Sequence, residues 1–95
     1  MSIGKVVIKH STMDEEMSQY AIMEASDAIS VLFNDKTSNS ELAEFIRKKF
    51  KSNYFKSNWH CIVGQSFGAL VTHETGRYIY FFIGKKGFLI WSTPL

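Results

Sequence analysis

Two pairs of neighbouring residues carry side chains suited to catalysis or metal binding. His60 and Cys61 would supply a base and a nucleophile, but adjacent residues on a strand point to opposite faces, so their side chains cannot easily meet. His73 and Glu74 begin a zinc-protease motif, yet Arg77 stands where the second histidine is needed. We therefore expect a buried, structural cysteine, no catalytic residue, no metal site and no cofactor.

A basic cluster in the middle of the chain raises the question of nucleic-acid binding. Its cations are Arg47, Lys48, Lys49, Lys51 and Lys56, with Tyr54 and Phe55 between them. Basic and aromatic side chains together are typical of surfaces that bind phosphates and bases. The net charge of the whole chain is only +2, however, and a solvated helix face also explains the cluster. We favour the solvated face and expect no nucleic-acid partner; a nucleic-acid-binding module is the alternative.

The composition predicts one small folded domain. A chain of 95 residues has room for a single hydrophobic core, so residues 1–95 are treated as one domain. Hydrophobic residues make up 45% of it, which excludes a disordered tail. The single cysteine and the lack of a signal-like N-terminus favour a cytoplasmic protein. The longest apolar run, 78–83, is far shorter than the ~20 residues of a membrane-spanning helix, so no membrane partner is expected.

Two amphipathic helices are predicted after a short N-terminal strand. β-branched residues favour a strand at 5–9, and the lysines at its ends suit a sheet edge. Thr12 and Glu15 form a capping box, and apolar residues then recur at helical spacing to about residue 33. A second apolar stripe follows a polar turn, and Ser38 or Ser40 would cap that helix.

The rest of the chain has strand periodicity. Four strands are predicted, at 59–63, 67–73, 77–83 and 88–91, with a hairpin turn from Gly84 to Gly87 between the last two. The element order is therefore β-α-α-β-β-β-β. This order predicts an α+β fold with an antiparallel sheet and two helices.

Both faces of the predicted strand at 77–83 are apolar. Tyr78, Tyr80 and Phe82 point to one face, and Ile79, Phe81 and Ile83 point to the other. The helices can cover one face, so the other requires a partner. Oligomerisation is the stabilising route left to a small chain without disulfides or zinc ligands. Capture of an extended peptide by strand addition also fits these features.

Several long motifs resemble the small dynein light chain family of the dimeric hub type. They are WHCIVG at 59–64, FG at 67–68, VTHET at 71–75, YIYF at 78–81 with Gly84, VIK at 7–9 and MDEEM at 13–17. The resemblance covers essentially the whole chain. It implies a strand-swapped homodimer with a central β-sandwich, in which the segment around 67–71 crosses to the sheet of the other subunit.

The resemblance also implies a function. A non-catalytic hub of this kind would hold short linear peptide motifs in two parallel grooves and so promote dimerisation of its partners. It would serve in the dynein motor complex, in the cytoplasm and on the microtubule cytoskeleton. Its partners would be the dynein intermediate chain and other proteins with short linear motifs. A fixed motor subunit with little peptide exchange is the alternative.

The resemblance further assigns residues to the groove and to the dimer interface. Positions that match or flank the peptide groove are Lys9, Ser66, Phe67, Gly68, Ala69, Leu70, Val71, Thr72, His73, Tyr78, Tyr80 and Phe82. The dimer interface would include His60, Phe67 and Val71, with His60 facing its symmetry mate, so that protonation would weaken the dimer. Asn39 and Ser40 replace an acid and a lysine that hold a peptide glutamine, and Leu70 and Phe82 replace tyrosines. The preferred motif is therefore expected to differ.

Overall fold

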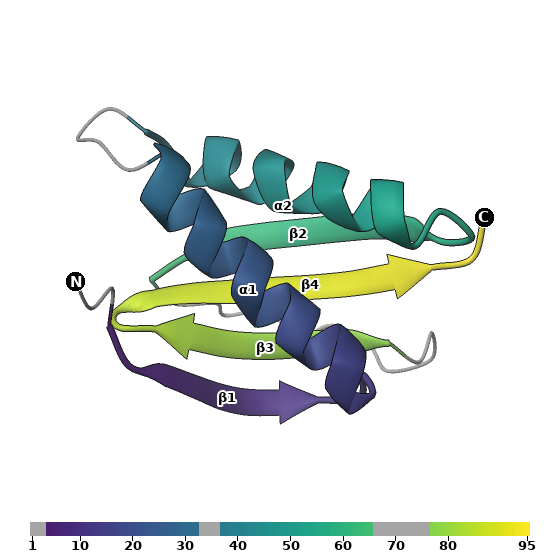
Figure 1. Cartoon of the computed structure of the whole chain (residues 1–95), viewed down its shortest axis with the longest axis horizontal. Coiled ribbons are helices and arrows are strands. Elements are labelled where there is room, and N and C mark those ends of the chain that lie inside the picture. Colours follow the sequence, from purple (N-terminus) through teal and green to yellow (C-terminus); the bar gives the residue numbers. More distant parts are fainter. Residues whose placement is uncertain (1–3, 33–36, 66–76) are drawn as a thin grey trace.

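The structure of the chain is a computed structural model that describes residues 4–32, 37–65 and 77–95. Its elements are β1 (Val6–Ser11), α1 (Glu15–Leu32), α2 (Asn39–Asn53), β2 (Asn58–Gly64), β3 (Tyr78–Ile83) and β4 (Lys86–Thr93) (Figure 1). Two helices and an antiparallel sheet confirm the predicted α+β class. The predicted strand at 67–73 lies outside the described residues.

The strands form one antiparallel sheet in the order β1-β3-β4-β2. A two-residue turn joins β3 to β4, and its first residue, Gly84, has a φ of +61°, which favours glycine. The predicted turn, which extends to Gly87, is too long, because Lys86 already pairs with Ile83. β4 is also longer than predicted and continues to Thr93, since it has a paired strand on each side.

The start of α1 differs from the sequence prediction. The Asp14 carboxylate accepts a hydrogen bond from the backbone N–H of Met17 at 2.8 Å, so Asp14 caps this helix. The prediction of a Thr12 cap is wrong. The Thr12 hydroxyl instead accepts a hydrogen bond from the backbone N–H of Tyr78 at 3.0 Å, at the end of the β1–β3 ladder.

The start of α2 confirms one of the two predicted caps. Ser38 and Glu41 form a capping box, in which each side chain accepts a hydrogen bond from the other residue's backbone N–H. Asn39 is the first helical residue, and its Oδ1 accepts a hydrogen bond from Nζ of Lys86 at 2.8 Å. The N-terminus of α2 is thereby tied to the start of β4.

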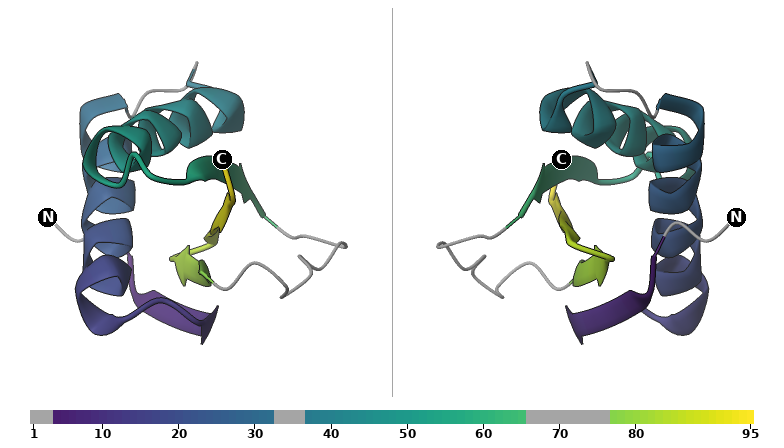
Figure 2. Two further views of the ribbon diagram at one scale, coloured as in Figure 1. Left: turned by 90° about the vertical axis from the view of Figure 1, so that its right-hand side faces the viewer. Right: turned by 90° about the vertical axis from the view of Figure 1, so that its left-hand side faces the viewer.

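Both helices pack on the same face of the sheet (Figures 1 and 2). The core side chains that are completely buried are Ala21, Ala25 and Ala28 of α1, Ile46 and Phe50 of α2, and Ile79, Phe81, Phe88 and Ile90 of the sheet. Phe81 and Phe88 stack with their ring centroids 5.2 Å apart. This is the face that the sequence predicts for Ile79, Phe81 and Ile83, and the prediction is confirmed.

A group of aromatic rings fills the space between the two helices and β2. Tyr20 contacts Phe50 and Tyr54, and the Trp59 indole donates a hydrogen bond to the Tyr54 carbonyl at 2.7 Å.

Glu24 is buried on α1 with 7% of its surface exposed, and its Oε1 finds no hydrogen-bond partner among the described residues. Burial, together with the neighbouring Glu24 carboxylate, raises the pKa of Tyr20 to about 12.

Candidate functional site

The sheet face that points away from the helices, here called the outer face, is lined by aromatic and apolar side chains. Its residues include Val7, Lys9, His10, His60, Ile62, Tyr78, Tyr80, Phe82, Leu89 and Trp91. Their placement follows from the strand register, because side chains of directly paired residues share a face. In the part of the chain that the structure describes, no helix or strand covers this face (Figure 2).

One row of the outer face crosses three strands. His60, Trp91 and Tyr78 are directly paired residues of β2, β4 and β3. The His60 ring stacks on Trp91 with centroids 5.2 Å apart, and its Nε2 lies 2.9 Å from Oγ1 of Thr93. These contacts fix the orientation of the His60 imidazole on an otherwise largely apolar surface.

β1 and β3 supply a second aromatic group on the outer face. His10 stacks on Tyr78 with centroids 5.2 Å apart, and its Nδ1 is hydrogen-bonded to the Tyr78 hydroxyl. A register shift at Lys9 turns that side chain to the same face, where Nζ lies 5.9 Å from the centroid of the Phe82 ring. This distance is within the range of a cation–π contact. Tyr80 lies beside Phe82 with centroids 5.6 Å apart, and both rings are only half-buried.

The described part of the predicted site therefore comes together on one surface. Lys9, Tyr78, Tyr80 and Phe82, predicted for the peptide groove, share the outer face with His60, predicted for the dimer interface. The other predicted residues lie outside the described residues; they are Ser66, Phe67, Gly68, Ala69, Leu70, Val71, Thr72 and His73. Their assignment remains a prediction.

Several residues of the outer face escaped the sequence prediction of the site, among them Val7, His10, Ile62, Leu89 and Trp91. Leu89 and Trp91 alternate with core residues of β4, and that alternation was the available signal. The register of β4 against β3 decides which of the β4 side chains point to the outer face. This register depends on pairing between segments that are distant in sequence.

Cys61 lies on the opposite face from His60, as the strand argument predicts. It pairs with Ile90 and packs against the core beneath the helices. Burial raises the pKa of its thiol to about 12, so almost no thiolate is present near neutral pH. A nucleophilic pair of Cys61 and His60 is not formed in this structure.

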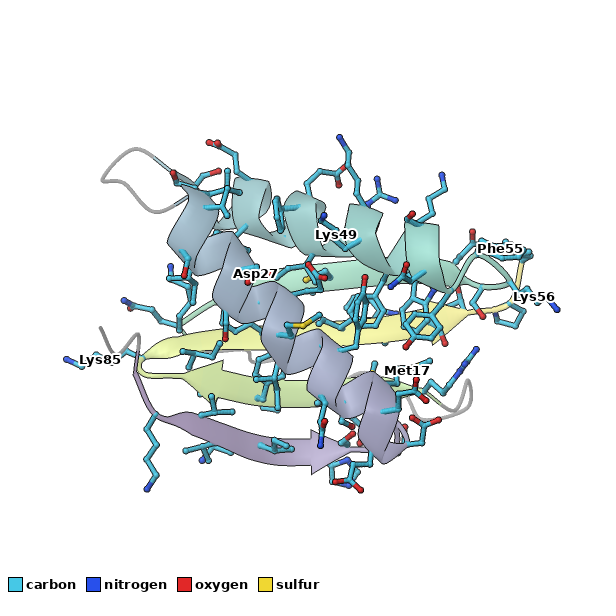
Figure 3. All side chains as sticks on the ribbon, viewed as in Figure 1. Met17, Asp27, Lys49, Phe55, Lys56 and Lys85 are labelled. Carbon is cyan, nitrogen blue, oxygen red and sulfur yellow. The ribbon has the colours of Figure 1, made fainter. Side chains whose placement is uncertain are left out.

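The basic cluster is partly neutralised by its own helix. Arg47 donates two hydrogen bonds to the Glu44 carboxylate, at 2.8 and 2.7 Å, which lowers the pKa of that carboxyl. The ammonium group of Lys49 lies 5.5 Å from the centroid of the Phe45 ring. Phe55 is 68% exposed at the turn after α2, next to Lys56 (Figure 3). Lys48, Lys49 and Lys51 are exposed on α2, so this part of the cluster is a solvated helix surface.

Two other kinds of site can be assessed for the described ranges. Within residues 4–32, 37–65 and 77–95, no three His, Cys, Asp or Glu side chains are grouped so that they could hold a metal ion. Neither helix in these ranges is long and apolar enough to cross a membrane.

These features define a class of protein: a small α+β domain with two helices on one sheet face and an aromatic second face. The family described as "Dynein light chain type 1" matches residues 5–93. A protein of Schistosoma mansoni named "Dynein light chain" is 42% identical over 93 residues, which cover 98% of this chain and 99% of that protein. The chain belongs to the dynein light chain family. This membership supports a dynein light chain role and confirms the resemblance found in the sequence.

Solved structures share the fold at low sequence identity. The dynein light chain-like domain of a calcium-binding protein from Fasciola hepatica superposes with a TM-score of 0.84 and 17% identity, covering 96% of this chain and 93% of that one. The dynein light chain-like domain of CsTAL3 superposes with a TM-score of 0.76 and 17% identity, covering both chains completely. These similarities establish the arrangement of helices and strands.

Proposed function

We propose that this chain is a non-catalytic homodimeric hub of the dynein motor, which binds short linear motifs of partner proteins by β-strand addition. Two copies would pack their outer faces together. Two grooves at the edges of this sandwich would each accept one extended peptide, so that two partner chains are held side by side. The dynein intermediate chain is the expected motor partner, and the cytoplasm and microtubules the expected location.

The outer face is the observation that carries the proposal. It joins aromatic rings of three strands with apolar side chains such as Ile62, which is 42% exposed. Apolar side chains that a chain leaves exposed beside one another are typical of interaction sites. A second copy would cover the rings, and family membership supports that arrangement.

The proposed strand exchange uses the open edge of β2. Among the described residues β2 pairs only with β4, so one side of its backbone is available for another strand. The segment around 67–71 of the second subunit would pair there, and a guest peptide would pair with that segment in turn. Lys9 and Tyr80 would line the guest's side chains, as the family resemblance implies.

The start of α2 supports an altered motif preference. Family members hold a peptide glutamine with an acid and a lysine at the positions of Asn39 and Ser40. Here the Asn39 Oδ1 already accepts a hydrogen bond from Lys86. A guest glutamine would compete with that bond, so we expect this chain to depend less on glutamine than its relatives do.

A peptide-array screen followed by titration tests the proposal. The best extended peptide should bind with one peptide per subunit, and the complex should contain two subunits. The Ile62→Asp substitution should abolish peptide binding and the association of two subunits, because it places a carboxylate in the dimer contact. Phe55→Asp is the matched control, since Phe55 is also exposed but lies away from the outer face. If no peptide binds, the proposed hub is wrong, and the alternative of a fixed motor subunit with little peptide exchange is left.

A further inference from the structure

β1 forms the other edge of the sheet, and the direction of its backbone groups can be read from the register. Among the described residues β1 pairs with β3 alone. The Lys5 carbonyl accepts a hydrogen bond from the N–H of Gly84, opposite it, at 2.9 Å. In an antiparallel ladder, hydrogen-bonded and non-hydrogen-bonded pairs alternate. Val7 therefore points its backbone groups toward β3, while Val6 and Ile8 point theirs toward the open side.

The side chains of this edge are unusually apolar for an exposed strand. Val6 is 39% exposed, Val7 38% and Ile8 47%. α1 crosses the sheet diagonally and covers only the C-terminal end of β1 (Figure 1). There the Oγ atoms of Ser11 and Ser18 lie 3.1 Å apart. Val6 and Ile8 share the helix side with Ile83 and Phe81 but remain uncovered. Proteins usually protect such edges from pairing with further strands.

The charges around β1 oppose pairing with a second copy of the same strand. Outward pairing between two antiparallel β1 strands would set Val6 against Ile8 of the other copy, and therefore Lys5 against Lys9. Two such like-charged contacts would be destabilising. Lys85 projects from the β3–β4 turn near the start of β1 (Figure 3) and adds to the positive charge at that end. The edge is thus basic and apolar, which complements an acidic and apolar strand.

We propose that the β1 edge is a second strand-addition site, whose occupant is a short extended segment of another protein with apolar residues beside acidic ones. Its backbone would pair with Val6 and Ile8, its apolar side chains would cover theirs, and its carboxylates would lie near Lys5 and Lys85. The register shift at Lys9 ends the regular ladder and limits the segment to a few residues. This site extends a different strand from the one used in the proposed function, because β1 lies at the opposite end of the strand order from β2.

The test follows backbone amide signals of the full chain during titration with a capped pentapeptide. The probe has glutamate at both ends and valine, threonine and valine between them; the control peptide has lysine in place of glutamate. The glutamate peptide should shift the amides of Val6 and Ile8 and leave those of Tyr80 and Ile62 in place. Shifts confined to the outer face, equal binding of both peptides, or no shift would overturn the proposal.

Substitutions separate backbone pairing from charge. Ile8→Pro removes an outward N–H and leaves the bonds to β3 intact, so it should abolish binding, whereas Ile8→Thr keeps the N–H and should retain it. Lys5→Glu combined with Lys85→Glu should lower the binding affinity for the glutamate peptide by about fivefold and raise the affinity for the lysine peptide. This double variant keeps the test decisive if Ile8→Pro does not fold. A monomeric chain would disprove the proposed hub without affecting these outcomes.

Discussion

The two faces of the sheet are made by the same strands, yet the two helices cover only one of them. On the helix side, Ile79, Phe81 and Ile90 are completely buried under α1 and α2. On the outer face, Tyr80 and Phe82 stay half-buried and Ile62 is exposed. Strand alternation distributes apolar residues to both faces, so the difference comes from what lies against each one.

This difference explains why so small a chain has so many aromatic residues. A domain of this size buries only about 60–65% of the surface of its unfolded chain, so its own core provides limited stability. The helix side uses phenylalanines and isoleucines as a conventional core. The outer face uses rings with polar groups, such as Tyr80 and Trp91, which suit a surface that forms contacts with another molecule.

Adjacent phenylalanines on β3 give the largest test of this comparison. Phe81→Ala should lower the free energy of unfolding by about 3–5 kcal/mol, because it leaves a cavity under the helices. Phe82→Ala should lower the free energy of unfolding of the monomer much less, and it should mainly weaken the association of two copies. Denaturant unfolding at low and high protein concentration separates the two effects. Equal losses for both variants at low concentration would contradict the distinction between the faces.

Cys61 reports the protection of the helix side. Burial raises the pKa of the Cys61 thiol from 9.0 to about 12. The folded chain therefore favours the protonated thiol, and ionisation at high pH destabilises it. The stability of the chain is unaffected by this group below pH 9 and falls as the pH rises toward 12. At pH 8 iodoacetamide should modify Cys61 at least about a hundredfold more slowly in the folded chain than in denaturant. A Cys61→Ser, Phe55→Cys variant should react rapidly when folded. Fast reaction of Cys61 in the folded chain would contradict its packing against the core beneath the helices.

His60 should make the outer-face contact sensitive to charge. In the proposed dimer the two His60 rings face each other, so His60→Lys would place two like charges in one interface. The apparent dissociation constant of the dimer should rise by about tenfold or more. His60→Gln, which keeps a polar side chain without a charge, should change it much less. Sedimentation of the two variants measures this difference, and an unchanged dimer for His60→Lys would show that His60 is not at the contact.

Glu24 gives the smallest expected effect. Its Oε1 is buried without a hydrogen-bond partner among the described residues. Glu24→Leu should therefore stabilise the chain by about 1 kcal/mol, since the desolvated carboxyl group is removed. Asp27→Leu is the control on the same helix, and its effect should be near zero because Asp27 is exposed. Destabilisation by Glu24→Leu would mean that its contact with Tyr20 outweighs the burial cost.

The sequence pattern predicted those features that depend on local periodicity. The alternation of residues 78–83 identified both sheet faces, and the spacing of Ser38 and Glu41 located the start of α2. The start of α1 was predicted incorrectly because Thr12 has a competing partner, the backbone of Tyr78, which is distant in sequence. Local capping rules take no account of such long-range bonds.

The site was predicted only in part for a related reason. Lys9, Tyr80 and Phe82 could be assigned through family resemblance, since their motifs are local. Trp91 could not, because its outward position depends on pairing β4 with both β2 and β3. That two-sided pairing also explains why β4 is longer than predicted.

The mass of the chain in solution shows whether two copies associate through the outer face. Sedimentation equilibrium of the unmodified chain at pH 7, over a wide range of concentrations, measures whether the outer face is covered by a second copy. We expect a particle of two chains of 10.9 kDa each, which dissociates into monomers in the Ile62→Asp variant. A particle of one chain at every concentration, for both proteins, would contradict this expectation.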